Sequence, residues 1–284
     1  MKLVLSRKGF DWANGESPSP ILPDGWLRSL PIPDKQGNVQ YAQIYEGDTY
    51  PTGTIIEALT GGKITADSLA HFDPDIDHNA LPNRHPNWRG VFGQSEQSQS
   101  HLGNQKIGAG DMFLFFGLFQ QTEGSANNLK FVKDAPVIHL LWGYLQVGEV
   151  VPVTKDTAQQ YPQYKDHPHV AYPDRNKGNT IYIAKQNLEV GGITKPLPGY
   201  GVFPQYDAGL QLTAEGKNTS TWCLPRWFEK NLTYNLKDVR WSPCETDATK
   251  VLLDSARPGQ EFVVVNLDDD SAVEWLNRIF TCMK

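Results

Sequence analysis

The chain has 284 residues, a net charge of −6 and 39% hydrophobic residues, which is typical of a folded globular protein and excludes a disordered chain. No apolar run approaches the roughly 20 residues of a membrane-spanning helix, and the apolar stretch near the N-terminus is too short for a secretory signal. Three widely spaced cysteines form neither a disulfide framework nor a CxxC metal site, so we expect a reduced, cytoplasmic protein.

The predicted elements are mostly β-strands, because runs with alternating polarity or with many aromatic and β-branched residues dominate the chain. In chain order these strands cover residues 2–5, 40–45, 111–119, 137–153, 179–184 and 261–267. Gly143 and Gly148 interrupt the longest run and predict bulges or bends there.

Helices are predicted at residues 54–60, around residues 222–228, and at the C-terminus. The acids at 268–270 would cap the C-terminal helix and favour its dipole. Its apolar stripe consists of Ala272, Trp275, Leu276 and Ile279. Several strands with scattered short helices predict an α+β fold, built as one domain over residues 1–284 around a mostly antiparallel sheet that could close into a barrel.

Residues 6–34 form a polar segment with five prolines that follows the first strand. Proline fixes φ in advance and lowers the entropy lost when such a loop is ordered, so this segment is expected to present side chains. Asp11 is its candidate catalytic residue, as an acid, a base or a stabiliser of an oxocarbenium ion, although a purely structural role fits equally well. The candidate binding residues of the segment are Arg7, Lys8, Phe10 and Asp24. An Asp-Gly turn explains Asp24 better than function does.

Five ionisable residues gather within positions 71–78, and His71, Asp73 and Asp75 are the candidates for function among them. Imidazole and carboxylate groups are suitable metal ligands. Their spacing matches no HExxH or EF-hand motif, so we expect contacts with a polar substrate and no bound metal.

The segment 93–104 holds three glutamines, three serines and a histidine before an aromatic strand. Gln94, Gln97 and His101 are spaced to share one helical face, where amides could read the edge of a base. A solvated helix is the alternative.

His167 and His169 flank a proline and could bind a ligand, but a polar loop is the favoured interpretation. The aromatic segments 113–119 and 222–228 could sandwich a base, although core packing explains them better. The sequence contains no phosphate-binding loop, GxGxxG, GxSxG or CxxC motif, so we expect no cofactor.

Several blocks of the sequence resemble one known family. They are SRKGFD, PSPILPDG, LPIPD, HFDPDI, GQSEQSQSHLGNQKIGAGDMFLFFGLF, HLLWGYLQVGEVV, HPHV, NTIYIA and LPRWF, between about residue 3 and residue 241. The chain is similar to the third of the nucleotide-modification-associated domain families of bacteria and phages. The block GAGDMFLFF with WGYLQVGEVV is also similar to PUA-like barrels that read modified bases.

The resemblance implies a partner, DNA carrying modified bases, and a role in phage conflict. The net charge does not exclude this partner, because residues 245–284 carry eight acids against four bases and leave −2 for the rest of the chain. We expect a hydrolase, a DNA glycosylase that flips a hypermodified base into a pocket and cleaves its N-glycosidic bond. The alternatives are a non-catalytic reader of modified bases, and a metal-dependent nuclease or phosphohydrolase that uses His71, Asp73 and Asp75.

Overall fold

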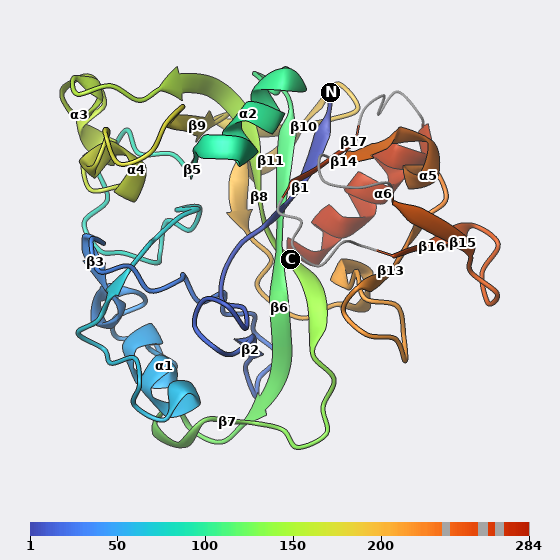
Figure 1. Ribbon diagram of the computed structural model, residues 1–284, viewed down its shortest axis with the longest axis horizontal. Helices are drawn as coiled ribbons and strands as arrows, with labels where there is room; N and C mark the ends of the chain where they lie inside the picture. The colour runs from blue at the N-terminus through green and yellow to red at the C-terminus, as the bar shows by residue number, and fades with distance from the viewer. Residues whose placement is uncertain (235–238, 255–260, 265–269, 284) are drawn as a thin grey trace.

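The centre of the molecule is a mixed β-sheet. The computed structural model describes residues 1–234, 239–254, 261–264 and 270–283. Within them the main strand path is β14–β17–β1–β6–β8–β9–β5, and β2, β7 and β12 pair at its sides. The bounds are β1 (Leu3–Arg7), β2 (Ser19–Ile21), β5 (Val91–Gln94), β6 (Met112–Glu123), β7 (Lys130–Phe131), β8 (Ile138–Pro152), β9 (Thr180–Ala184), β12 (Tyr200–Val202), β14 (Leu232–Tyr234) and β17 (Glu261–Val264). Figure 1 shows β6 and β8 as the long central strands.

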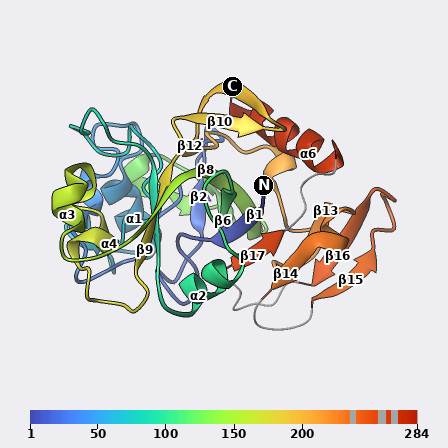
Figure 2. The same ribbon diagram turned by 90° about the horizontal axis from the view of Figure 1, so that it is seen from above.

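Smaller elements surround this sheet. Three small sheets contain β3 (Val39–Gln40), β4 (Leu69–Ala70), β10 (Asn187–Val190), β11 (Ile193–Pro198), β13 (Thr221–Pro225), β15 (Arg240–Pro243) and β16 (Lys250–Asp254). The α-helices are α1 (Thr52–Thr60), α2 (Glu96–Asn104), α3 (Thr157–Gln160), α4 (Pro168–Ala171), α5 (Phe228–Asn231) and α6 (Asp270–Phe280). Short 3-10 helices cover Tyr41–Gln43, Ala126–Asn128, Pro162–Tyr164, Ala208–Leu210 and Thr281–Met283. Figure 2 shows β13, β15 and β16 on the side of the molecule away from α3 and α4.

The predicted α+β class with a mostly antiparallel sheet and a C-terminal helix is confirmed. Strand β6 pairs in parallel with β1 and β2 but antiparallel with β7 and β8. The barrel stays a prediction, because the strand path of the described residues runs from β14 to β5 without closing.

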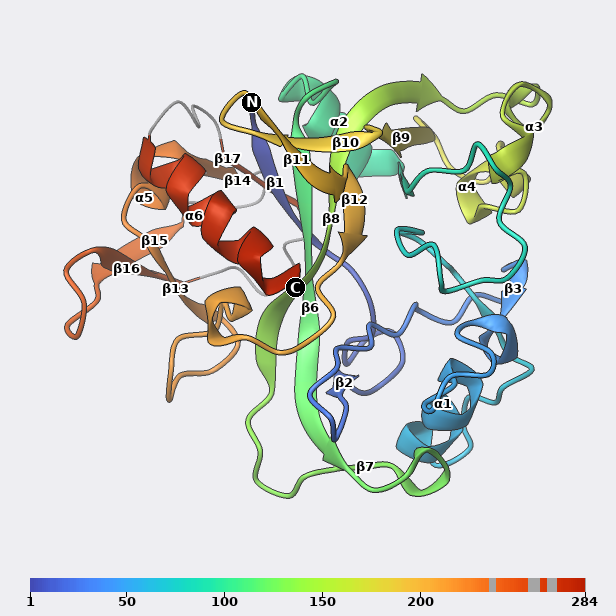
Figure 3. The ribbon, with the colours of Figure 1, turned by 180° about the vertical axis from the view of Figure 1, so that it is seen from behind.

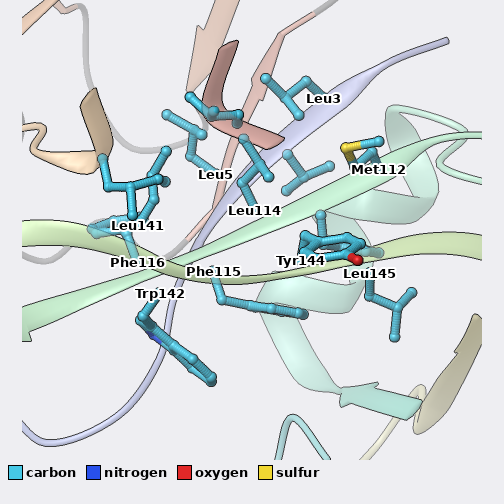
Figure 4. Packing of buried hydrophobic residues seen from close by; sticks show 14 of the residues in the cluster. Leu3, Leu5, Met112, Leu114, Phe115, Phe116, Leu141, Trp142, Tyr144 and Leu145 are labelled. Carbon is cyan, nitrogen blue, oxygen red and sulfur yellow. The ribbon is translucent and has the colours of Figure 1, made fainter. Parts of the chain in front are cut away.

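The two long strands carry the core. The first eight residues of β6 are all buried, which explains why this run is apolar without the alternation of a half-exposed strand. Figure 4 shows Leu114 and Phe115 on opposite sides of β6. Phe115 packs against Trp142 with ring centroids 5.8 Å apart, while Leu114 belongs to the same buried cluster as Leu5. The aromatic run at 113–119 therefore builds the core, as the sequence favoured.

The strongest sequence patterns became the expected elements. The strands predicted at 2–5, 111–119, 137–153 and 179–184 and the helix at 54–60 correspond to β1, β6, β8, β9 and α1. The pairing of β8 with β9 shifts in register at Gly148, and its pairing with β6 shifts next to Gly143. Both glycines thus mark irregularities in the strand, as predicted.

Two short predictions were wrong. Of the strand predicted at 40–45, only Gln40 lies in a strand, β3. A 3-10 helix follows, because the buried Tyr41 turns inward and its hydroxyl donates to the Pro31 carbonyl at 2.7 Å. Of the helix predicted around 222–228, residues 222–225 belong to strand β13, because Trp222 pairs with Leu253 of β16 and packs in the core; a helix, α5, begins only at Phe228.

The C-terminal helix α6 packs as its sequence predicts. Ala272, Trp275, Leu276 and Ile279 are all buried. Of the predicted capping acids, 268 and 269 lie outside the described residues, as does the end of the strand predicted at 261–267. Among the described residues no helix combines the length and apolar character needed to cross a membrane.

Candidate active site

A polar cleft of about 760 Å³ lies where segments distant in sequence meet. Its walls come from the loop after β1, the segment after β4, the end of β5, α4 and residues 175–176. Figures 1 and 3 show the chain leaving β1 and crossing to the side of β6 that carries α1 and α4. Six residues predicted from the sequence line this cleft: Arg7, Lys8, Asp11, His71, Asp73 and Gln94.

The other predicted residues lie elsewhere. Phe10 is 1% exposed and packs in a second apolar cluster, so it anchors the loop and does not face the cleft. The Asp24 carboxylate accepts a hydrogen bond from the Trp26 backbone N–H at 3.1 Å, as a turn-forming aspartate does. The prediction that Gln94, Gln97 and His101 share one helical face was wrong. Gln94 ends strand β5, whereas on α2 Gln97 is exposed and His101 is buried.

Asp75, also predicted as a binding residue, is part of a buried ion pair outside the cleft. The two guanidinium nitrogens of Arg84 donate to its carboxylate oxygens at 2.6 and 2.5 Å. Arg84 also stacks over the Trp88 ring, 4.2 Å from its centroid. Both carboxylate oxygens of Asp75 are thus occupied by a structural partner.

Asp73 lies at the floor of the cleft, with its side chain 2% exposed. Its Oδ1 accepts hydrogen bonds from the Gly93 backbone N–H at 2.7 Å and from His167 Nε2 at 3.1 Å. Its Oδ2 lies 4.0 Å from His71 Nε2 and 3.8 Å from His169 Nε2, beyond hydrogen-bond reach. One oxygen is therefore fixed by the protein, and the other faces two imidazoles.

The other nitrogens of these two imidazoles hold them in place. His71 Nδ1 donates to Asp34 Oδ2 at 3.1 Å, and His169 Nδ1 donates to Asn179 Oδ1 at 2.6 Å. The Asn179 orientation is set by its amide nitrogen, which donates to the His169 carbonyl at 2.9 Å. Since Nδ1 is the donor in both rings, each Nε2 carries a lone pair.

Burial controls the charges of this cluster. It lowers the pKa of His169 to about 4 and also lowers the pKa of His71, so both imidazoles are neutral near pH 7. Burial opposes ionisation of Asp73, but the hydrogen bond and charge of His167 outweigh it and hold the pKa of that carboxyl below its usual range. The floor therefore combines a carboxylate with two neutral imidazoles.

Asp11 lies at the rim of the cleft in a tight loop. Its Oδ1 accepts from the backbone N–H groups of Ala13 and Asn14 at 2.8 and 2.7 Å, and its Oδ2 pairs with Arg7 at 3.1 Å. The indole of Trp12 beside it is 61% exposed and lines the same cleft. Asp11 thus holds the rim loop in shape, whereas its predicted catalytic role stays a prediction.

A glycine makes room for His169. A Cβ built on Gly93 would lie 2.2 Å from His169 Cδ2, which no real contact permits. Gly93→Ala should therefore displace the ring and lower the unfolding free energy by about 1–3 kcal/mol, measured by chemical denaturation. Gly103→Ala is the matched control, because a Cβ there meets nothing within 4 Å. Equal stability of the two variants would contradict the predicted crowding.

Comparison with known proteins places this chain in a family. The family model described as nucleotide modification associated domain 3 matches residues 2–265, nearly the whole chain. The chain belongs to this family. No curated protein and no solved structure matches it. Membership associates the chain with nucleotide modification systems, as the resemblance implied, and the description of the nucleotide modification associated domain says nothing about the reaction.

In this nucleotide modification associated domain, sequence reasoning missed several groups around the floor. Asp34 and Asn179 orient the two imidazoles, and Arg175 pairs with Asp34 at 2.5 Å. The sequence also presents His167 and His169 as a pair, but it favours a polar loop there, whereas the structure places His169 in the cleft and His167 against Asp73. The signal in the sequence was the pair of histidines itself, because a loop does not require two histidines to fold. They stand 96 and 98 positions after His71.

The domain also buries a glutamate that the sequence did not single out. Glu261 is 1% exposed, and its Oε1 accepts from Gln94 Nε2 at 2.6 Å and from Ser6 Oγ at 3.0 Å. Its Oε2 has no hydrogen-bond partner among the described residues, and Lys8 Nζ lies 4.0 Å from Oε1. Burial raises the pKa of Glu261 to about 7, although Lys8 opposes the rise.

This buried carboxyl predicts a pH-dependent stability. Its pKa is about 7 in the fold against 4.5 ordinarily, so its contribution is fully present below pH 4.5 and is lost as pH rises through 7. Between pH 5 and 8, we expect ionisation of Glu261 to lower the unfolding free energy of the wild type by up to about 3 kcal/mol. Glu261→Gln should lack this decline. Denaturant titrations across this range measure it, with the exposed Glu215→Gln as control. An unchanged pH profile in Glu261→Gln would contradict the shifted pKa.

Proposed function

We propose that this protein is a hydrolase that takes a modified nucleotide of DNA into the cleft and cleaves its N-glycosidic bond. The observation that carries the proposal is the Asp73 carboxylate oxygen, buried at the cleft floor between the neutral imidazoles of His71 and His169. The carboxylate oxygen can accept the proton of a water molecule whose other hydrogen is donated to one of these imidazoles, in a site shielded from bulk solvent.

The rim of the cleft supports a nucleotide as the substrate. Trp12 offers an exposed indole on which a base can stack, and Arg7, Lys8 and Arg175 place cations along the same cleft. Stacking and charge of this kind suit an aromatic base attached to a phosphate backbone. Family membership in nucleotide modification systems supports the same class of substrate.

The depth of the floor supports the glycosidic bond over the phosphodiester bond. Asp73 is only 2% exposed, so a phosphate in a stacked duplex does not reach it. A nucleotide turned out of the helix enters such a pocket with its base and sugar. Water oxygen would then bond to the sugar C1′ while the bond from C1′ to the base nitrogen breaks. Asp73 accepts the proton that the attacking water loses, the base leaves with the electron pair of the broken bond and takes up one proton, and an abasic site stays in the DNA.

The test is incubation of the full chain with hydroxymethylated, glucosylated and unmodified DNA. We expect free modified base, and strand breaks that appear only after alkali, which reveals abasic sites. Strand breaks without alkali would replace the proposal with phosphodiester hydrolysis. Tight binding of modified DNA with no product from any substrate would overturn it in favour of a reader.

A further inference from the structure

We propose that His71, Asp73 and His169 bind one divalent first-row transition metal ion. The sequence predicted a site without metal, so this inference revises that expectation. It does not depend on the bond cleaved in the proposed reaction, because metal binding is measured without any substrate.

The first argument is the surplus of acceptors at the cleft floor. The Nδ1 atoms of His71 and His169 donate to Asp34 and Asn179, so each Nε2 presents a lone pair. Asp73 Oδ2 is an acceptor as well, and both Nε2 atoms lie about 4 Å away from it, at 4.0 and 3.8 Å. A water molecule can donate to only two of three acceptors. A cation satisfies all three.

The second argument is geometric. The three ligand atoms all lie within 4.8 Å of one another. Atoms that share a metal ion at bond lengths of about 2.0–2.2 Å lie roughly 3 Å apart, so small side-chain movements close the site. His71 is 21% exposed on the side of the cleft, which leaves coordination positions open toward a substrate. Two histidines and one carboxylate with open positions form the ligand pattern of catalytic metal centres.

The third argument is the support behind each ligand. Asp34, which orients His71, is itself held by Arg175. Asn179 accepts from His169 and donates back to its carbonyl oxygen. His167 and the Gly93 N–H occupy Asp73 Oδ1 and leave Oδ2 for the ion. Outer partners of this kind fix the orientation of metal ligands in proteins.

The ligand types indicate which metals fit. Imidazole nitrogen favours iron, cobalt, nickel, copper and zinc, whereas calcium and magnesium prefer sites built from oxygen atoms alone. Two imidazoles with one carboxylate therefore select a transition metal over Ca²⁺ or Mg²⁺.

The experiment is a titration of the chelator-treated, full-length protein with Co²⁺, followed by its visible absorption and by equilibrium dialysis. We expect one Co²⁺ per chain and a rise in melting temperature on binding. His71→Ala and His169→Ala should weaken binding by at least about 100-fold, and Asn179→Ala by about 10–100-fold. His85→Ala is the matched control, because His85 is exposed and lies outside this cleft. The affinity of this variant for Co²⁺ should equal that of the wild type.

Two outcomes would overturn the proposal. One is the absence of stoichiometric Co²⁺ binding by the wild-type protein, which needs no variant to fold. The other is wild-type affinity in both His71→Ala and His169→Ala. The two proposals fail separately. Binding of Co²⁺ without release of any base overturns only the glycosidic reaction, whereas base release without metal binding overturns only the metal site.

Discussion

Asp73→Asn is expected to lower the rate of base release by about 10²–10⁴-fold. The asparagine oxygen can still accept from Gly93 and His167, as Asp73 Oδ1 does. The amide nitrogen, however, replaces Oδ2 with a donor and removes the negative charge that faces the two imidazoles. The measurement is single-turnover release of modified base, with circular dichroism to show that the variant is folded.

Asp11→Asn separates this role from the one predicted for Asp11. Its Oδ1 is occupied by the Ala13 and Asn14 backbone, and its Oδ2 by Arg7. We therefore expect base release to fall far less than in Asp73→Asn. If Asp11→Asn abolishes release and Asp73→Asn does not, Asp11 is the catalytic residue and the assignment to the cleft floor is wrong.

Arg84→Met is expected to lower the unfolding free energy by about 3–5 kcal/mol, because it leaves the buried Asp75 carboxylate without its partner. Both side chains of this pair are only 9% exposed. The pair is bidentate, so the loss includes two charge-assisted hydrogen bonds. Chemical denaturation at neutral pH measures the effect.

Two comparisons make this prediction sharp. Lys63→Met breaks the exposed pair of Lys63 with Glu16, whose side chains are 71% and 68% exposed, and should leave the unfolding free energy nearly unchanged. Combining Asp75→Asn with Arg84→Met should recover part of the loss, because no buried charge is left unpaired. Equal effects of Arg84→Met and Lys63→Met would refute a structural role for the Asp75 pair.

The long elements were predictable because their signals are local. The apolar runs of β6 and β8 are rich in aromatic and β-branched residues, which favour strands. The apolar stripe of α6 repeats at helical spacing. Short segments were not predictable. Trp222 lies in a strand that packs it against Phe116 and Phe262, which are far from it in sequence. Tyr41 lies in a 3-10 helix that buries it in the second apolar cluster.

The site was predictable only in part. The loop after β1 and the cluster at 71–78 could be recognised from the sequence, because each concentrates charge in a short segment. Together they contribute Arg7, Lys8, His71 and Asp73 to one cleft. The same reasoning could not separate Asp73 from Asp75. They are two residues apart, yet one faces two imidazoles and the other faces Arg84.

The sequence by itself determined the family, the α+β class and the short segments that contain most of the cleft's charged residues, since all of these follow from local composition and motif. Only the tertiary structure decided the chemistry of the floor. Asp34, His71, Asp73, His169 and Asn179 meet through strand pairing and loop packing across 145 positions of the chain. Which lone pairs face one another depends on the hydrogen bonds that these residues make in the fold.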